Sequence, residues 1–169
     1  MMHPVQAFCE WLAATALSTE IQSIGWIVPA LQTIHILSIA MVMSAVTMVD
    51  LHVLGILSRS QPLAAVARRF LPWIWWTLIV LLLSGSTLII GEPGRSLRNP
   101  AFILKMSMLA IALVLTLFFQ RGLRQDALFW EKSPGRRAAG RLLAVVSLAL
   151  WVGIVFAGRW IAYVNVDAV

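Results

Sequence analysis

The chain has little of two residue classes that stabilise or equip most soluble proteins, cysteine and charged residues. Cys9 is the only cysteine among 169 residues, which excludes an intramolecular disulfide and a metal cluster held by several thiolates. Charged residues make up 12% of the chain and hydrophobic residues 60%, with a mean hydropathy of +0.88. Because so few charges cannot cover so much apolar surface in water, this composition excludes a soluble domain and predicts a multi-pass membrane protein.

The N-terminal segment lacks the features of a signal peptide. It has no basic beginning, its apolar run is broken, and it contains two glutamates. We therefore interpret it as mature protein. Val5, Phe8, Trp11 and Leu12 recur at helical spacing and predict a short interfacial helix at about residues 4–17. A loosely ordered terminus is the alternative.

Four apolar stretches are each long enough to cross a bilayer, which needs about 20 residues at a rise of about 1.5 Å. They predict an all-α membrane protein in which residues 1–169 form a single four-helix transmembrane domain. We expect the spans at about residues 27–57, 72–90, 101–120 and 142–163. The remaining segments are too short for a separate soluble catalytic domain, so any chemistry must lie among the helices.

The basic residues gather mainly between spans. The chain has 13 Lys and Arg against 7 Asp and Glu, a formal net charge of +6. Most lie in the loops from Arg59 to Arg69 and from Arg121 to Arg141, which predicts that these loops face the cytoplasm and that both termini are extracytoplasmic, in a bacterial cytoplasmic membrane. Such charges contact anionic head groups, so we predict no nucleic-acid partner.

Three basic side chains from three different spans are expected at one level near the extracytoplasmic face: His35, Lys105 and Arg159. Each lies about 6–9 Å of helix inside the end of its span, and Gln32 lies one turn above His35 on the same face. Because ionisable groups are costly in hydrocarbon, this convergence predicts a binding site. In the alternative, Lys105 and Arg159 reach the head groups, and a neutral His35 bonds a serine or a carbonyl.

Haem b fits these residues best, because neutral imidazole is an axial ligand of haem iron and the two propionates need cationic partners. We predict His35 as the axial ligand and Lys105 and Arg159 as the propionate partners. Met108 is a candidate sixth ligand, with core packing as its alternative. His52 is about 25 Å deeper than His35, so it does not serve as a second ligand. If the sixth position of the iron is open, oxygen chemistry or sensing is favoured over simple electron transfer.

The haem prediction implies a redox subunit that transfers electrons or oxidises a hydrophobic substrate such as a quinone or a porphyrin. Whether the protein is an enzyme stays open at this point. Its expected partners are the lipid bilayer and a membrane redox partner or quinone, with an oligomer as a further candidate. A non-enzymatic scaffold or partner-binding module is the first alternative function.

Copper handling is the second alternative. Two pairs of methionines, Met41 with Met43 and Met106 with Met108, supply the soft thioethers that select Cu(I). Residues two apart on a helix point to different sides, so packing among methionine-rich helices is the ordinary explanation.

Asp50 is the other ionisable group that we expect inside a span. It lies about 22 Å along the helix from His35, near the basic loops. We expect a salt bridge from its carboxylate to Arg68, Arg69 or Arg141.

Several segments of the chain carry a resemblance to a known family. They are PALQTIHILSIAMVM, VDLHVLGIL, FLPWIWW, IIGEP, NPAFILKM and LWVGIVFAGRWIAY. The chain resembles an uncharacterised family of small bacterial four-helix integral membrane proteins over nearly its whole length, most specifically in the GRWIAY ending. The resemblance implies the fold but no activity. The family's usual arginine at the position of His52 argues against His52 as a ligand.

A more distant likeness rests on the histidine in the first span, the lysine early in a later span and the four-helix layout. In these features the chain is similar to the membrane-embedded haem-binding protoporphyrinogen oxidase and to the copper-resistance membrane protein family. The first likeness implies that His35 is a haem ligand and Lys105 its helper. Similarity of fold does not by itself transfer an activity.

Overall fold

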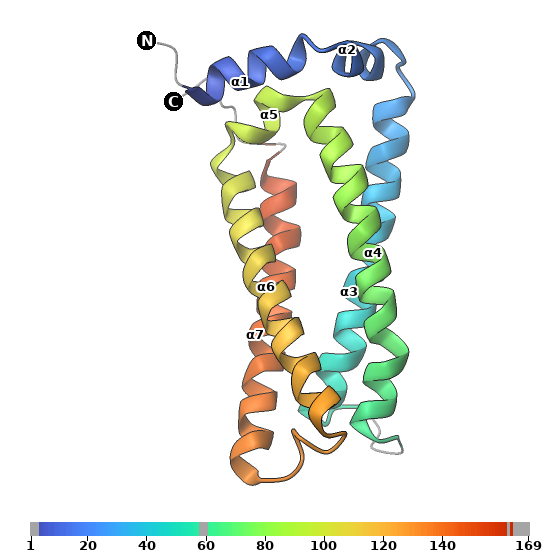
Figure 1. The fold of residues 1–169 in the computed structure, drawn as a ribbon, viewed down its shortest axis with the longest axis vertical. Coiled ribbons are helices and arrows are strands. Elements are labelled where there is room, and N and C mark those ends of the chain that lie inside the picture. The colour runs from blue at the N-terminus through green and yellow to red at the C-terminus, as the bar shows by residue number, and fades with distance from the viewer. Residues whose placement is uncertain (1–3, 58–60, 162, 164–169) are drawn as a thin grey trace.

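A computed structural model of the chain describes residues 4–57, 61–161 and 163, and Arg59 of the first basic loop lies outside them. Within these residues the chain forms helices and no strands, as predicted (Figure 1). The helices are α1 (Pro4–Ala13), α2 (Ala16–Ser23), α3 (Ile27–Leu54), α4 (Leu63–Gly91), α5 (Pro93–Leu97), α6 (Pro100–Gln125) and α7 (Pro134–Trp160).

Four of the described helices, α3, α4, α6 and α7, are long and apolar enough to cross a membrane. They run along the long axis of the molecule (Figure 1). Large apolar side chains cover their outer faces; Leu82 and Phe156, for example, are 68% and 67% exposed. An outer face of this kind is stable against lipid and costly in water. The predicted multi-pass membrane protein is therefore confirmed in its architecture.

Three spanning helices, α4, α6 and α7, extend beyond the predicted spans at the end of the molecule that carries the basic loops, whereas α3 ends at Leu54, short of the predicted residue 57. α4 begins at Leu63 and continues through Pro72, where the sequence predicts the second span to start. α6 ends at Gln125, and α7 begins at Pro134 with Ser133 as its N-cap. Hydropathy locates the segment that lies in hydrocarbon, whereas caps and turns set where a helix ends.

The spanning helices pack as two antiparallel hairpins, α3 with α4 and α6 with α7, which meet where α3 packs against α7. Small side chains lie where the helices approach each other, among them the buried Ala45, Ala67 and Ala112. Small residues allow close backbone approach, which gives the dispersion contacts that hold membrane helices together. Val42 and Trp151 lie in the same core.

Helices α1 and α2 lie across one end of the bundle, where α1 packs against α5 and α2 packs against α4 (Figure 1). The predicted 4–17 helix is thus two helices, because Thr15 caps the start of α2 with its side chain. Two polar side chains of α2 bond the end of α4: the Ser18 hydroxyl donates to Ile90 O at 2.7 Å, and the Gln22 amide donates to Gly91 O at 2.7 Å. These bonds satisfy carbonyls at the end of a helix, where intrahelical partners are lacking.

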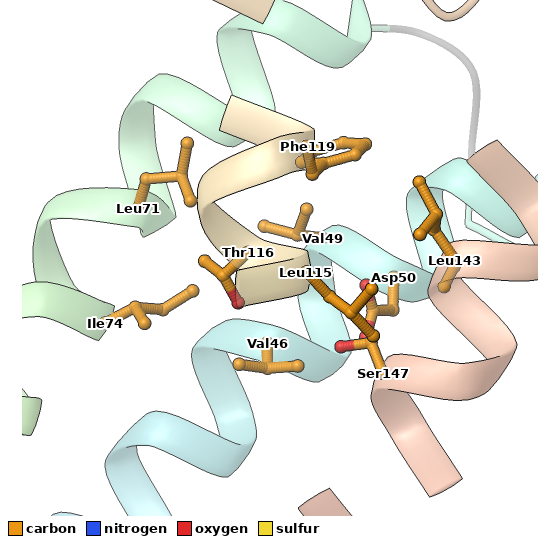
Figure 2. A pocket seen from close by; sticks show the side chains of 11 residues that line it. Val46, Val49, Asp50, Leu71, Ile74, Leu115, Thr116, Phe119, Leu143 and Ser147 are labelled. Carbon is orange, nitrogen blue, oxygen red and sulfur yellow. The ribbon is translucent and has the colours of Figure 1, made fainter. Parts of the chain in front are cut away.

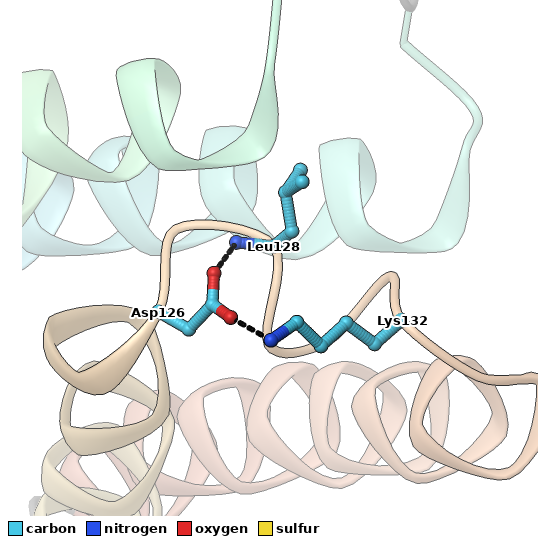
Figure 3. Close-up of polar contacts among 3 residues, drawn as sticks. All are labelled: Asp126, Leu128 and Lys132. Atoms are coloured by element: carbon cyan, nitrogen blue, oxygen red, sulfur yellow. Dashed lines mark hydrogen bonds and ion pairs between the residues drawn. The ribbon is translucent and has the colours of Figure 1, made fainter.

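The α6–α7 loop closes the opposite end of the bundle. Its buried Trp130 stacks on Phe119 with ring centroids 5.5 Å apart, and its indole N–H donates to Phe119 O at 3.1 Å. Asp126 accepts from the Leu128 N–H at 2.9 Å and pairs with Lys132 (Figure 3). The bond from Lys132 lowers the pKa of Asp126 below its ordinary value, and the Leu128 N–H lowers it further.

Candidate functional site

His35 lies on α3, partly buried, with its ring against α4. Its Nδ1 is 2.8 Å from the Ser84 hydroxyl, and that hydroxyl donates its hydrogen to Val80 O at 2.7 Å. The Ser84 oxygen therefore accepts from His35, which assigns the imidazole proton to Nδ1. The Nε2 lone pair has no hydrogen-bond partner in the described part of the chain. The bond to Ser84 is the one that the alternative predicts for a neutral His35. Because Nε2 stays free, an imidazole oriented in this way can also bind a metal.

Gly85 makes this position of the imidazole possible. A Cβ atom on Gly85 would lie 3.3 Å from His35 Cε1, so the ring packs directly against the α4 backbone. A Cβ atom at position 85 would require the ring to shift by a few tenths of an ångström. The Ser84-Gly85 pair thus supplies a hydrogen bond and the space for it.

Lys105 lies on α6, partly buried, and rests against Gly158 of α7. A Cβ atom on Gly158 would lie 3.6 Å from Lys105 Nζ. Lys105 also interacts electrostatically with His35 across the bundle. Among the described residues its ammonium has no hydrogen bond or ion pair. A partly buried cation without an anion is costly in an apolar surrounding, so this position suits an anionic group from a ligand.

Arg159 and Gln32 do not join His35 and Lys105. Arg159 is exposed, donates to Tyr163 Oη at 3.2 Å and lies 5.5 Å from the centre of the Tyr163 ring. Gln32 is likewise exposed on α3. Each residue of a helix is rotated by about 100° from the one before it, so Arg159 cannot share the direction in which Gly158 faces Lys105. Of the four predicted site residues, Arg159 and Gln32 are thus exposed and lie apart from His35 and Lys105. The meeting of His35 and Lys105 around one ligand stays a prediction.

The methionines occupy packing positions or exposed faces. Met108 Sδ lies 3.0 Å from where a Cβ atom of Gly153 would be, and Met108 packs against the core. Met41 and Met106 are exposed. Met108 therefore lies in the seam between α6 and α7, which is the core-packing alternative. In the part of the chain that the structure describes, no three His, Cys, Asp or Glu residues form a metal-binding group.

Asp50 is the polar group whose surroundings the sequence does not predict. The carboxylate is buried at 8% exposure, and its Oδ2 has no hydrogen-bond partner. The expected salt bridge is absent among the described residues. Asp50 is buried, whereas Arg68, Arg69 and Arg141 are all exposed. The carboxylate instead borders an internal cavity beside Ser147 of α7 (Figure 2). The sequence signal for this site is the presence of a serine, Ser147, on the fourth span at the depth of Asp50 on the first.

The chain was compared with known families, curated proteins and solved structures. A model of a family of unknown function (DUF6644) matches residues 8–164. No curated protein and no solved structure matches, so the likenesses to protoporphyrinogen oxidase and to the copper-resistance proteins are not shown. The family match confirms the predicted resemblance to an uncharacterised family. Because it covers nearly the whole sequence, the chain belongs to the family of unknown function DUF6644.

Proposed function

We propose that this protein binds haem b between its helices, with His35 as the axial ligand, and acts as a redox subunit of the bacterial cytoplasmic membrane. The observation that carries the proposal is the orientation of His35. The imidazole gives its Nδ1–H to Ser84 and leaves Nε2 without a partner. Histidines that bind metals commonly donate the other ring N–H to an oxygen, which fixes the tautomer and the ring plane.

Lys105 supports the same proposal by its charge. Its ammonium, partly buried and without an anionic partner among the described residues, interacts electrostatically with His35. A haem propionate would supply the missing negative charge. Since Arg159 is bound to Tyr163, Lys105 is the cation that we assign to a propionate, and we leave Arg159 out of the site.

When bound, haem would supply one-electron redox chemistry. The chain's own contribution is to hold the imidazole through Ser84, to place a positive charge nearby and to surround both with apolar helices. Met108 packs against Gly153, so we propose no sixth protein ligand. An open coordination position suits reaction with a small or hydrophobic molecule, such as oxygen, a quinone or a porphyrin, more than simple electron transfer.

The test is an absorption spectrum of the protein purified in detergent after expression with added haem. We expect a Soret band in the wild-type protein and its loss in His35→Ala. In Ser84→Ala the band should weaken or shift, because the ring loses the acceptor that orients it. His52→Ala is the matched control, a histidine of the same helix, and should keep the full band. Size-exclusion chromatography checks that each variant is folded.

Absence of a Soret band from folded wild-type protein, or its retention in His35→Ala, would refute the proposal. In that case the first alternative function, a scaffold or partner-binding module, would be favoured. The placement of the methionines does not favour copper, since Met41 and Met106 are exposed and Met108 packs against Gly153. Metal analysis of the same sample and of a Met106→Leu, Met108→Leu variant tests that alternative directly.

A further inference from the structure

A second internal site surrounds Asp50, in the half of the bundle farther from α1 and α2. Among buried side-chain nitrogen and oxygen atoms of the described residues, two have no hydrogen-bond partner, Asp50 Oδ2 and Trp151 Nε1. Asp50 comes from α3 and is 8% exposed. A buried carboxylate oxygen without a donor is costly in an apolar interior, so this atom indicates a missing partner.

The space for a partner is present. A cavity of about 30 Å³ borders the carboxylate. A water molecule needs a cavity of at least about 10–15 Å³ on this measure and two or more polar partners. Ser147 of α7 lies beside the carboxylate, and Thr116 of α6 lines the same cavity (Figure 2). The Thr116 hydroxyl donates to Ala112 O at 2.8 Å, so its oxygen remains free to accept a hydrogen bond.

Among the residues that the structure describes, no charged group other than Asp50 itself lines this cavity. α4 contributes the apolar Leu71 and Ile74 to the cavity wall, and the contributions of α6 and α7 are apolar apart from the two hydroxyls. A carboxylate charge in these surroundings has no counter-ion, and the attraction that normally offsets its desolvation is missing. Neutralisation by a proton removes this cost.

We propose that Asp50 is a proton-binding site whose carboxyl group exchanges its proton with a water molecule held in this cavity by Ser147 and Thr116. In the exchange, the O–H bond of the carboxyl breaks and a new O–H bond forms on the water, which gives a carboxylate and a hydronium ion. The reverse transfer restores the acid. A metal cation is disfavoured, because hard cations take about six or more oxygen ligands, more than the carboxylate and two hydroxyls provide. The proposal does not depend on haem.

The test is infrared spectroscopy of the full-length protein in lipid nanodiscs, with and without ¹³C-labelled aspartate. At neutral pH we expect a carbonyl stretching band of a protonated, isotope-labelled carboxyl group that shifts in D₂O. Asp50→Asn should lose this band. Asp126→Asn is the matched control and should keep it, since Asp126 is paired with Lys132 at the surface. The band should decrease as the pH is raised.

Two further variants test the assignment of the infrared band to Asp50 even if Asp50→Asn does not fold. Ser147→Ala should shift the band by removing a hydrogen-bonding group, and Ala144→Leu should shift it by filling the cavity that holds the water. Identical labelled spectra of wild type and folded Asp50→Asn, or no protonated band at neutral pH, would overturn the proposal. Thermal stabilisation by sodium chloride over choline chloride, lost in Asp50→Asn, would overturn it in favour of a metal cation.

Discussion

At the scale of single residues, the structure shows long side chains of one helix resting on glycines of another. His35 contacts Gly85, and Lys105 contacts Gly158. Met108 is placed in the same way, against Gly153, and Trp130 of the α6–α7 loop rests on Gly122. Glycine brings a helix backbone close enough to be touched by a side chain that would otherwise have to turn towards lipid. At these four positions, the glycines allow a side chain to pack directly against the backbone of a helix.

Gly122 gives the sharpest test of these contacts. A Cβ atom there would lie 2.8 Å from Phe129 Cδ1 and 2.9 Å from Trp130 Nε1, whereas a Cβ on Gly140 would lie 3.5 Å from Trp130 Cε3. We expect Gly122→Ala to destabilise the protein by about 1–3 kcal/mol through overpacking, and Gly140→Ala to change stability little. Thermal unfolding in detergent measures both. Equal unfolding temperatures for the two variants would contradict this account of the α6–α7 loop.

Sequence reasoning at this scale succeeds for some groups and not for others. The proximity of Lys105 to His35 follows from helix depth, since both lie at one level on their own spans. The bond of His35 to a serine is the alternative that the sequence offers for this residue. Depth alone does not give direction, and for this reason Arg159 was expected in the site although its rotation on α7 turns it towards Tyr163. The roles of His35 and Lys105 in haem binding stay predictions.

At the scale of helices, α6 depends on one buried cap. Asn99 is 0% exposed, its side-chain oxygen accepts from the Ala101 N–H at 2.9 Å, and its amide donates to Ile161 O at 3.2 Å. The same side chain therefore begins α6 and holds the end of α7. The existence of both helices could be predicted from their apolar runs. Their ends could not, because this cap joins segments that are distant in the sequence.

Replacement of this cap should be costly. We expect Asn99→Ala to destabilise the protein by about 1–3 kcal/mol, because a buried acceptor and donor lose their partner at once. Ser133→Ala is the control, since Ser133 caps α7 through a single exposed bond to the Arg136 N–H at 3.3 Å, and its loss should cost about 1 kcal/mol or less. Chemical or thermal unfolding followed by circular dichroism compares them. A larger loss for Ser133→Ala would contradict the role given to Asn99.

At the scale of the whole molecule, the four-span architecture could be predicted from composition, because lipid imposes both the length and the apolar character of the helices. The packing of the hairpins could not be predicted, since every face of these helices is largely apolar. The orientation in the membrane is a prediction from the arginine-rich loops. It places α1, α2 and α5 outside and the α6–α7 loop in the cytoplasm.

Single cysteines test this orientation. Gly94 and Gly135 lie at opposite ends of the molecule, and a Cβ atom on either meets nothing within 4 Å. The native Cys9 is buried at 5% exposure and should react slowly. We expect a membrane-impermeant maleimide to label Gly94→Cys in intact spheroplasts, and to label Gly135→Cys after the membranes are opened. The reverse pattern would invert the assigned topology.

The division of the bundle into two hairpins has a consequence for the distance between its two inner basic groups. His35 is tied to Ser84 within the α3–α4 hairpin, and Lys105 rests on Gly158 within the α6–α7 hairpin. The separation of imidazole and ammonium is therefore set by the packing between the hairpins, which includes the α3–α7 contact and the bond from Trp75 Nε1 on α4 to Gln120 Oε1 on α6 at 3.2 Å. A shift of one hairpin relative to the other would change this separation even if every hydrogen bond within each hairpin were kept. The packing between the hairpins therefore sets the electric field that the ammonium exerts at the histidine.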